Sequence, residues 1–210
     1  MFPLDTELFN TLHSLTGQSG LLDWLFVLLA SWLPWVIGIA AVIVIVRLRP
    51  WRHSVWMVLA TGLTLILARG IVTPLLHELI LRTRPFEALS FTPLIMVAHG
   101  NSFPSGHATA FFALAFVLFY ENRKRGWWFI GFALVNALAR VVVGVHYPSD
   151  ILAGALVALV SAFAIHALIK NFAPKEVRLV KTGVEGHAKS DAEEPAVPPE
   201  PPAVDAVGKI

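Results

Sequence analysis

The sequence lacks cysteine and is poor in charged residues. Without cysteine it forms no disulfide, offers no thiolate nucleophile and has no cysteine-ligated metal. Only 14% of its 210 residues are charged and 56% are hydrophobic, which leaves too little polar surface to cover the core of a soluble domain. The net charge of +2 is too small to indicate a nucleic-acid partner. These shortages exclude thiol chemistry and favour a protein whose solvent is the lipid bilayer.

Long apolar runs take the place of the missing charge. Several approach the ~20 residues that cross a hydrocarbon layer about 30 Å thick, and they predict an all-α, polytopic membrane helix bundle of five to six transmembrane helices. Pro34 breaks the first run, which is then either one kinked span or, as we favour, a short interfacial piece followed by a span. The runs cover residues 21–48, 55–76, 108–120, 127–145 and 151–169.

Three groups of basic residues follow the first, third and fifth runs. Placing all three groups on the cytoplasmic side satisfies the positive-inside tendency with strictly alternating spans. Residues 77–104 and 145–150 then emerge together on the extracytoplasmic side. The basic groups are Arg47, Arg49 and Arg52; Arg123, Lys124 and Arg125; and Lys170, Lys175, Arg178 and Lys181.

The two ends of the chain differ from its apolar middle. Residues 1–20 carry leucines at helical spacing and predict an interfacial amphipathic helix, whose start Asp5 or Thr6 can cap. Acidic residues where a basic segment is needed argue against a cleavable signal peptide. Residues 21–172 form the transmembrane domain. Residues 173–210 are rich in proline, alanine, glutamate and valine, which predicts a disordered cytoplasmic tail.

Three polar clusters interrupt the apolar sequence near span ends on one predicted side. Arginine presents a planar fork of donors that binds phosphate oxygens in pairs. A serine and a glycine at the start of an apolar helix add backbone N–H groups and the helix dipole for the same anion. A histidine four residues before an aspartate lets the carboxylate hold one imidazole nitrogen and activate the other as a nucleophile, with a further histidine free as an acid. The clusters are Arg82, Arg84 and Pro85; Pro104, Ser105, Gly106 and His107; and Arg140, His146 and Asp150.

Each cluster also has a purely structural interpretation. Arg82 and Arg84 can be headgroup anchors, because arginines at span ends often reach the interface. Arg140 can form a structural ion pair with Asp150, since an unpaired guanidinium inside an apolar run is expensive. Ser105 can simply cap the helix that follows it.

In this order the clusters resemble the signatures of the PAP2 (type 2 phosphatidic acid phosphatase) superfamily, which are Lys-x6-Arg-Pro, Pro-Ser-Gly-His and Ser-Arg-x5-His-x3-Asp. The resemblance covers about residues 76–168. It implies that residues 21–172 are a PAP2-like phosphatase domain that needs no metal ion or other cofactor. His146 would attack phosphorus, Asp150 would orient it, His107 would protonate the leaving oxygen, and water would then hydrolyse the phosphohistidine. The phosphoryl group would be bound by Arg84, Arg140, Ser105 and Gly106.

Two positions depart from these signatures. His77 stands where the first signature has lysine, and Ala139 stands where the third has serine. Histidine is a cation only when protonated. Either a protonated His77 or the nearby Arg82 would therefore replace the lysine in binding the substrate.

Residues 102–168 look most like the bacterial undecaprenyl-diphosphatases of the bacitracin-resistance branch. This resemblance implies conversion of undecaprenyl diphosphate to undecaprenyl phosphate for carrier-lipid recycling in peptidoglycan synthesis. It also implies a multi-pass protein of the bacterial inner membrane, surrounded by membrane lipid, with an extracytoplasmic site. The alternatives are a phosphatase for phosphatidylglycerophosphate, phosphatidic acid or lipid A, and a lipid-phosphate binder or transporter that catalyses nothing. The sequence carries no signal for oligomeric state.

Overall fold

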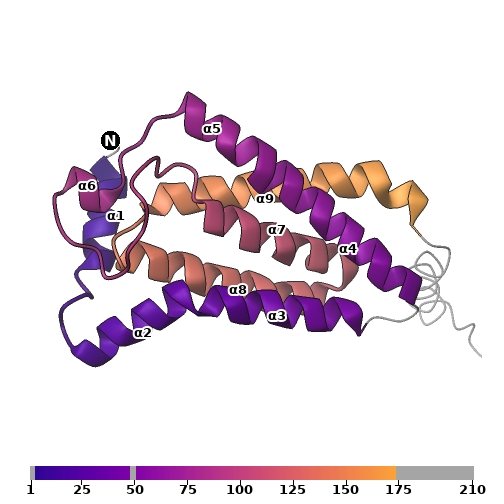
Figure 1. Ribbon diagram of the computed structural model, residues 1–210, viewed down its shortest axis with the longest axis horizontal. Coiled ribbons are helices and arrows are strands. Elements are labelled where there is room, and N and C mark those ends of the chain that lie inside the picture. The colour runs from indigo at the N-terminus through magenta and orange to yellow at the C-terminus, as the bar shows by residue number, and fades with distance from the viewer. Residues whose placement is uncertain (1–2, 48–50, 174–210) are drawn as a thin grey trace, which may run out of the picture. The chain divides into compact units, whose positions relative to one another are not determined.

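A computed structural model describes residues 3–47 and 51–173, which form helices joined by loops within one compact unit, Met1–Pro174. The three parts α4, η1 and α5 make one continuous helix, of which η1 is π-helical. The helices run along the bundle in Figure 1, apart from the short α1 and α6 near one end. In chain order they are α1 (Pro3–His13), α2 (Gly20–Ser31), α3 (Leu33–Val46), α4 (Trp51–Leu65), η1 (Ile66–Val72), α5 (Thr73–Leu79), α6 (Pro85–Ala88), α7 (Gly106–Glu121), α8 (Arg123–Val142), α9 (Pro148–Ile169) and η2 (Lys170–Phe172).

Helix α7 forms the centre of the bundle, where it packs against α4, α8 and α9. Two glycines bring these neighbours close. A Cβ at Gly126 would lie 2.2 Å from the Cα of Phe119, so only glycine allows α8 to turn back along α7. A Cβ at Gly154 would lie 2.8 Å from the carbonyl oxygen of Ser105. This second contact sets the start of α9 beside the start of α7, where two of the three polar clusters lie.

Two continuous helical segments are long and apolar enough to cross a membrane, Trp51–Leu79 and Pro148–Phe172. The pair α2 and α3, bent by 41°, gives a third candidate if it is one broken span. The described helices therefore support two to three spans, fewer than the predicted five to six. Helix α7 has 16 residues, which reach only about 24 Å, and α8 begins with the basic residues expected in a loop.

The predicted break in the first run is present, at Trp32, two residues before Pro34. Helix α2 ends at Ser31 and α3 begins at Leu33, with Pro34 in its first turn. Proline is tolerated there because the first N–H groups of a helix have no intrahelical partner.

Helix α1 has a buried face that the sequence did not indicate. Phe9 is fully buried and its ring lies 5.4 Å from that of Tyr147. Asp5 is also buried. It does not cap the helix, because α1 begins at Pro3 and the Asp5 carboxylate accepts hydrogen bonds from Ser149. The helix therefore packs on the bundle end, and its position at a membrane interface stays a prediction.

The two ends of the bundle differ in charge. Figure 1 shows the end of α3, the start of α4 and the turn between α7 and α8 at one end, which carries Arg47, Arg52 and Arg123. The loops that carry the polar clusters lie at the other end. This separation agrees with the predicted topology, while the cytoplasmic side itself stays a prediction. Apart from Ala173, the predicted tail lies outside the described residues.

Candidate active site

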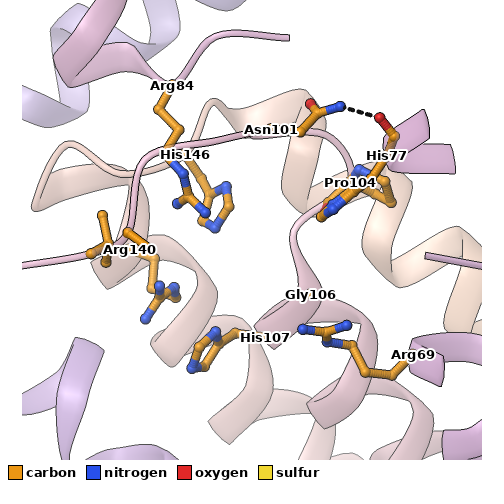
Figure 2. Close-up of a pocket in the computed structure, with 11 residues that line it drawn as sticks. Arg69, His77, Arg84, Asn101, Pro104, Gly106, His107, Arg140 and His146 are labelled. Atoms are coloured by element: carbon orange, nitrogen blue, oxygen red, sulfur yellow. Dashed lines mark hydrogen bonds between the residues drawn. The ribbon is translucent and has the colours of Figure 1, made fainter. Parts of the chain in front are cut away.

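A cavity of about 240 Å³ opens at the end of the bundle that carries the polar clusters. Figure 2 shows its basic side chains converging from different elements of the fold. Two come from α7 and α8, which pack side by side, two from the continuous helix formed by η1 and α5, and two from loops. The basic residues that line it are Arg69, His77, Arg84, His107, Arg140 and His146.

Arg84 and Arg140 line the cavity without a carboxylate partner among the described residues. The Nε atoms of Arg84 and Arg140 are buried without a hydrogen-bond partner in the described part of the chain. Each guanidinium has one long bond to a carbonyl oxygen, at 3.4 Å for Arg84 and 3.3 Å for Arg140. Burial lowers the pKa of Arg84, while Glu87 and Asp150 oppose that shift. Two neighbouring cations held in this way need an anion with several acceptor oxygens.

His146 is held by a carboxylate and points into the same cavity. It lies between α8 and α9, and its Nδ1 is 3.5 Å from Oδ2 of Asp150. Because Nδ1 faces this carboxylate, Nε2 is the nitrogen left for chemistry. Burial lowers the pKa of His146 to about 4, although its hydrogen bond with Asp150 raises it. The imidazole is therefore neutral at neutral pH, and its lone pair is available for attack.

Asp150 is fully buried, and donors surround its carboxylate. Oδ2 accepts from the Ser102 hydroxyl at 2.5 Å and from the backbone N–H of Tyr147 at 2.8 Å, and Oδ1 accepts from Arg82 at 2.7 Å. These bonds fix the orientation of the carboxylate, which in turn orients His146.

The structure does not bring Arg82 to the cavity. Its guanidinium lies between the carboxylates of Asp5 and Asp150, 4.2 Å above the ring of Tyr147. Two carboxylates attract it more strongly than the cavity, which already holds other cations. Arg82 therefore holds the Asp150 carboxylate in place through its Oδ1 atom, on the side away from His146. Because Asp150 pairs with Arg82, the predicted structural ion pair of Arg140 with Asp150 is not formed.

The second cluster divides between the cavity and the helix cap. Ser105 is fully buried and caps α7, since its hydroxyl accepts from the N–H of Ala108 at 3.4 Å. It does not line the cavity, whereas Gly106 and His107 do. His77, in the place of the family lysine, also lines the cavity, where its Nε2 lies 3.0 Å from the carbonyl oxygen of Pro104.

Three residues of the site were missed by the sequence prediction. Ser102 donates a hydrogen bond to Asp150, and Asp5 accepts one from Arg82, the arginine that binds Asp150. Arg69 lines the cavity, and its signal was present, because it is the only charge within residues 55–76. A charge inside a membrane segment indicates a functional site by default.

Comparison with known proteins identifies the family. Residues 56–174 match the sequence profile of the PAP2 superfamily. Undecaprenyl-diphosphatase BcrC of Bacillus subtilis (strain 168) is 30% identical over 179 residues, which cover 84% of this chain and 91% of that protein. A lipid A 1-phosphatase of Rhizobium etli is 41% identical over 99 residues, covering 43% of this chain and 41% of that protein.

The fold agrees with this family. The crystal structure of a transmembrane PAP2 type phosphatidylglycerolphosphate phosphatase from Bacillus subtilis superposes with a TM-score of 0.57 at 20% sequence identity. The likeness covers 80% of this chain and 85% of that one. At this identity it shows the fold alone. The chain belongs to the PAP2 superfamily and is a membrane-embedded lipid phosphatase of that type.

Proposed function

We propose that the protein hydrolyses undecaprenyl diphosphate to undecaprenyl phosphate and inorganic phosphate. The observation that carries this proposal is a pair of arginines with buried Nε atoms, Arg84 and Arg140, which lack a carboxylate partner among the described residues and lie beside His146. A terminal phosphate bound by both arginines would lie next to the nucleophile. The similarity to undecaprenyl-diphosphatase BcrC supports the choice of lipid.

An apolar groove beside the cavity supports a substrate with a hydrocarbon tail. The groove has a volume of about 640 Å³ and is lined mainly by apolar residues of α3, together with Phe111 of α7. His107 lines both the groove and the cavity. A lipid with its tail in the groove and its phosphate at the arginines would therefore place its leaving oxygen near His107.

The proposed reaction begins with attack by Nε2 of His146 on the terminal phosphorus. The bond from this phosphorus to the bridging oxygen breaks, the electron pair stays on that oxygen, and His107 donates a proton to it. Undecaprenyl phosphate leaves. Water then attacks the phosphohistidine and gives a proton back to His107, the phosphorus–nitrogen bond breaks, and Nε2 recovers its lone pair as inorganic phosphate departs.

The charge around His107 fits this sequence of steps. The groups that act on it electrostatically are Arg69, Arg84, Arg140 and His146, all basic. A phosphate anion bound among them supplies the negative charge that stabilises a proton on His107. The acid would then be formed by substrate binding itself.

We expect kcat/KM to stay high down to about pH 5 and to fall as the pH approaches 4. The nucleophile must be neutral, and burial lowers the pKa of His146 to about 4, so attack is available above that value and lost below it. The test is a pH–rate profile with two substrates whose phosphates differ in pKa. If the acidic fall in kcat/KM moves with the pKa of the substrate phosphate, it does not report His146. A fall near pH 6.5 with both substrates would contradict the lowered pKa of this buried histidine.

Phosphate release by the purified protein in detergent tests the substrate. With EDTA present, we expect kcat/KM at least ~10-fold higher for undecaprenyl diphosphate than for phosphatidylglycerophosphate, phosphatidic acid or lipid A, and inhibition when bacitracin sequesters the diphosphate. Preference for another lipid would overturn the proposed substrate but keep the phosphatase. Complete loss of activity with EDTA would contradict the metal-free mechanism, and absence of turnover would favour a binder.

Lipid A is the second candidate substrate, because the relative from Rhizobium etli is 41% identical over 99 residues. For either lipid we propose an extracytoplasmic site in a bacterial inner membrane. The separation of Arg47, Arg52 and Arg123 from the cavity supports this orientation, since basic residues favour the cytoplasmic side.

A further inference from the structure

Arg69 lies deep in a candidate membrane span. It belongs to η1, inside the continuous segment Trp51–Leu79, and is ten residues, or about 15 Å, from the end of that segment. An arginine at such a position is costly and normally has a partner or a ligand. Its guanidinium is exposed, and across residues 3–47 and 51–173 it has neither a hydrogen bond nor an ion pair.

The local backbone turns Arg69 toward the start of α7. Pro74 has no N–H for the regular i to i−4 pattern, and the N–H of Thr73 bonds instead to the carbonyl oxygen of Ala68, five residues back. The Thr73 hydroxyl donates to the same oxygen at 2.8 Å. Such π-helical turns are frequent at functional sites.

Gly106 leaves the room that the Arg69 side chain fills. A Cβ at Gly106 would lie 2.7 Å from Nε of Arg69 and 3.1 Å from its Nη2. The guanidinium therefore lies against the first residue of α7, next to His107. The positive end of the α7 dipole faces the same space.

The cavity thus has arginines on both sides of His107. Figure 2 shows Arg84, Arg140 and His146 on one side and Arg69 on the other. In a diphosphate, the leaving oxygen that His107 would protonate is the oxygen that bridges the two phosphorus atoms. With the terminal phosphate at Arg84 and Arg140, the arginine of the cavity that remains for a second phosphate is Arg69, on the other side of His107.

We propose that Arg69 binds the second, lipid-linked phosphate of a diphosphate substrate and so selects diphosphates over monophosphate esters. This inference rests on the proposed function. It names the feature that would distinguish a diphosphatase from a phosphatase for phosphatidic acid: a monophosphate ester has no second phosphate, and Arg69 then stays without a ligand. The arginine also stabilises the negative charge that develops on the departing phosphate.

The test compares Arg69→Gln with the wild-type protein on a prenyl diphosphate and on the monophosphate of the same prenyl chain. We expect kcat/KM for the diphosphate to fall about 10- to 100-fold, as for the loss of hydrogen bonds to a charged group. Activity on the monophosphate should fall much less than activity on the diphosphate, because the monophosphate loses no contact with Arg69 and only the electrostatic effect of Arg69 on His107 is removed. Arg69→Lys should retain part of the diphosphate activity, because lysine keeps the positive charge but lacks the paired N–H donors of the guanidinium.

A binding measurement separates recognition from catalysis. Methylenediphosphonate has a carbon bridge that is not hydrolysed, and its inhibition constant should rise about 10-fold or more in Arg69→Gln, whereas that of inorganic phosphate should stay within about twofold. The matched control is Arg52→Gln, which removes an exposed arginine from the other end of the same helical segment and should change neither constant.

Equal loss on both substrates, or equal weakening of both inhibitors, would overturn the inference, as would an unchanged Arg69→Gln protein. These outcomes differ from failure of the proposed function, which is the wild-type protein failing to hydrolyse undecaprenyl diphosphate while it cleaves a monophosphate lipid. In that case the methylenediphosphonate constants still decide whether Arg69 binds a second phosphate.

Discussion

His146→Ala should reduce kcat by at least ~1,000-fold, because it removes the atom that attacks phosphorus. Arg84 and Arg140 stay in place in this variant, so the inhibition constant of inorganic phosphate should change much less than turnover. The measurements are phosphate release and trapping of an acid-labile phosphoenzyme, which should form in the wild-type protein and be absent from the variant. Wild-type turnover in His146→Ala would remove His146 as the nucleophile.

The control for this variant is a histidine far from the cavity. His53 pairs with Glu121 at 2.9 Å, near the turn between α7 and α8 at the opposite end of the bundle. His53→Ala should retain activity within about threefold, since surface and distant changes rarely alter chemistry. Thermal unfolding of both variants in detergent shows whether loss of activity reflects loss of fold, because His146 is buried.

Asp150→Asn should lower kcat by about 100- to 10,000-fold with a much smaller change in KM. Ser102, Arg82 and the N–H of Tyr147 all donate to this carboxylate, and an asparagine offers only one acceptor oxygen. Its amide would face donors and leave His146 in the wrong tautomer or orientation, an error that is very costly in comparable dyads. Phosphate binding by Arg84 is unaffected, so the effect falls on turnover.

Asp5→Asn is the matched comparison for Asp150→Asn. Asp5 accepts from Arg82 and Ser149 but does not contact His146, so we expect a loss of about 10-fold or less from reduced support of Asp150. If Asp5→Asn loses as much as Asp150→Asn, the shared cause is the Arg82 network or the fold rather than the orientation of His146. More than a tenth of wild-type activity in Asp150→Asn would contradict the proposed role of the carboxylate.

Local spacing made part of the site predictable. His146 and Asp150 are four residues apart across the start of α9 at Pro148, so their contact follows from the chain itself. Gly106 and His107 begin α7 as the switch from polar to apolar sequence indicated. For Arg84, Arg140 and His107, the sequence predicted the same side of the membrane, and the helices bring them to one cavity.

Span counting was less successful, because apolar composition alone does not set helix length. The run at residues 108–120 became a 16-residue helix in the centre of the bundle, where burial by neighbouring helices also selects apolar residues. The loop predicted before residue 127 became the first turn of α8. Membrane spans and buried core helices share the same composition, so only packing separates them.

The sequence by itself determined the family, the order of the polar clusters and the His146–Asp150 pair, because each depends on residue type and short spacing. Only the tertiary structure decided where the remaining charges go. Arg82 turns to Asp5, 77 positions earlier in the chain, and Arg69 enters the cavity because the η1 backbone and Gly106 direct it there. Contacts between distant residues depend on how whole helices pack, and no local pattern encodes which of several arginines will find a carboxylate and which will be left for the substrate.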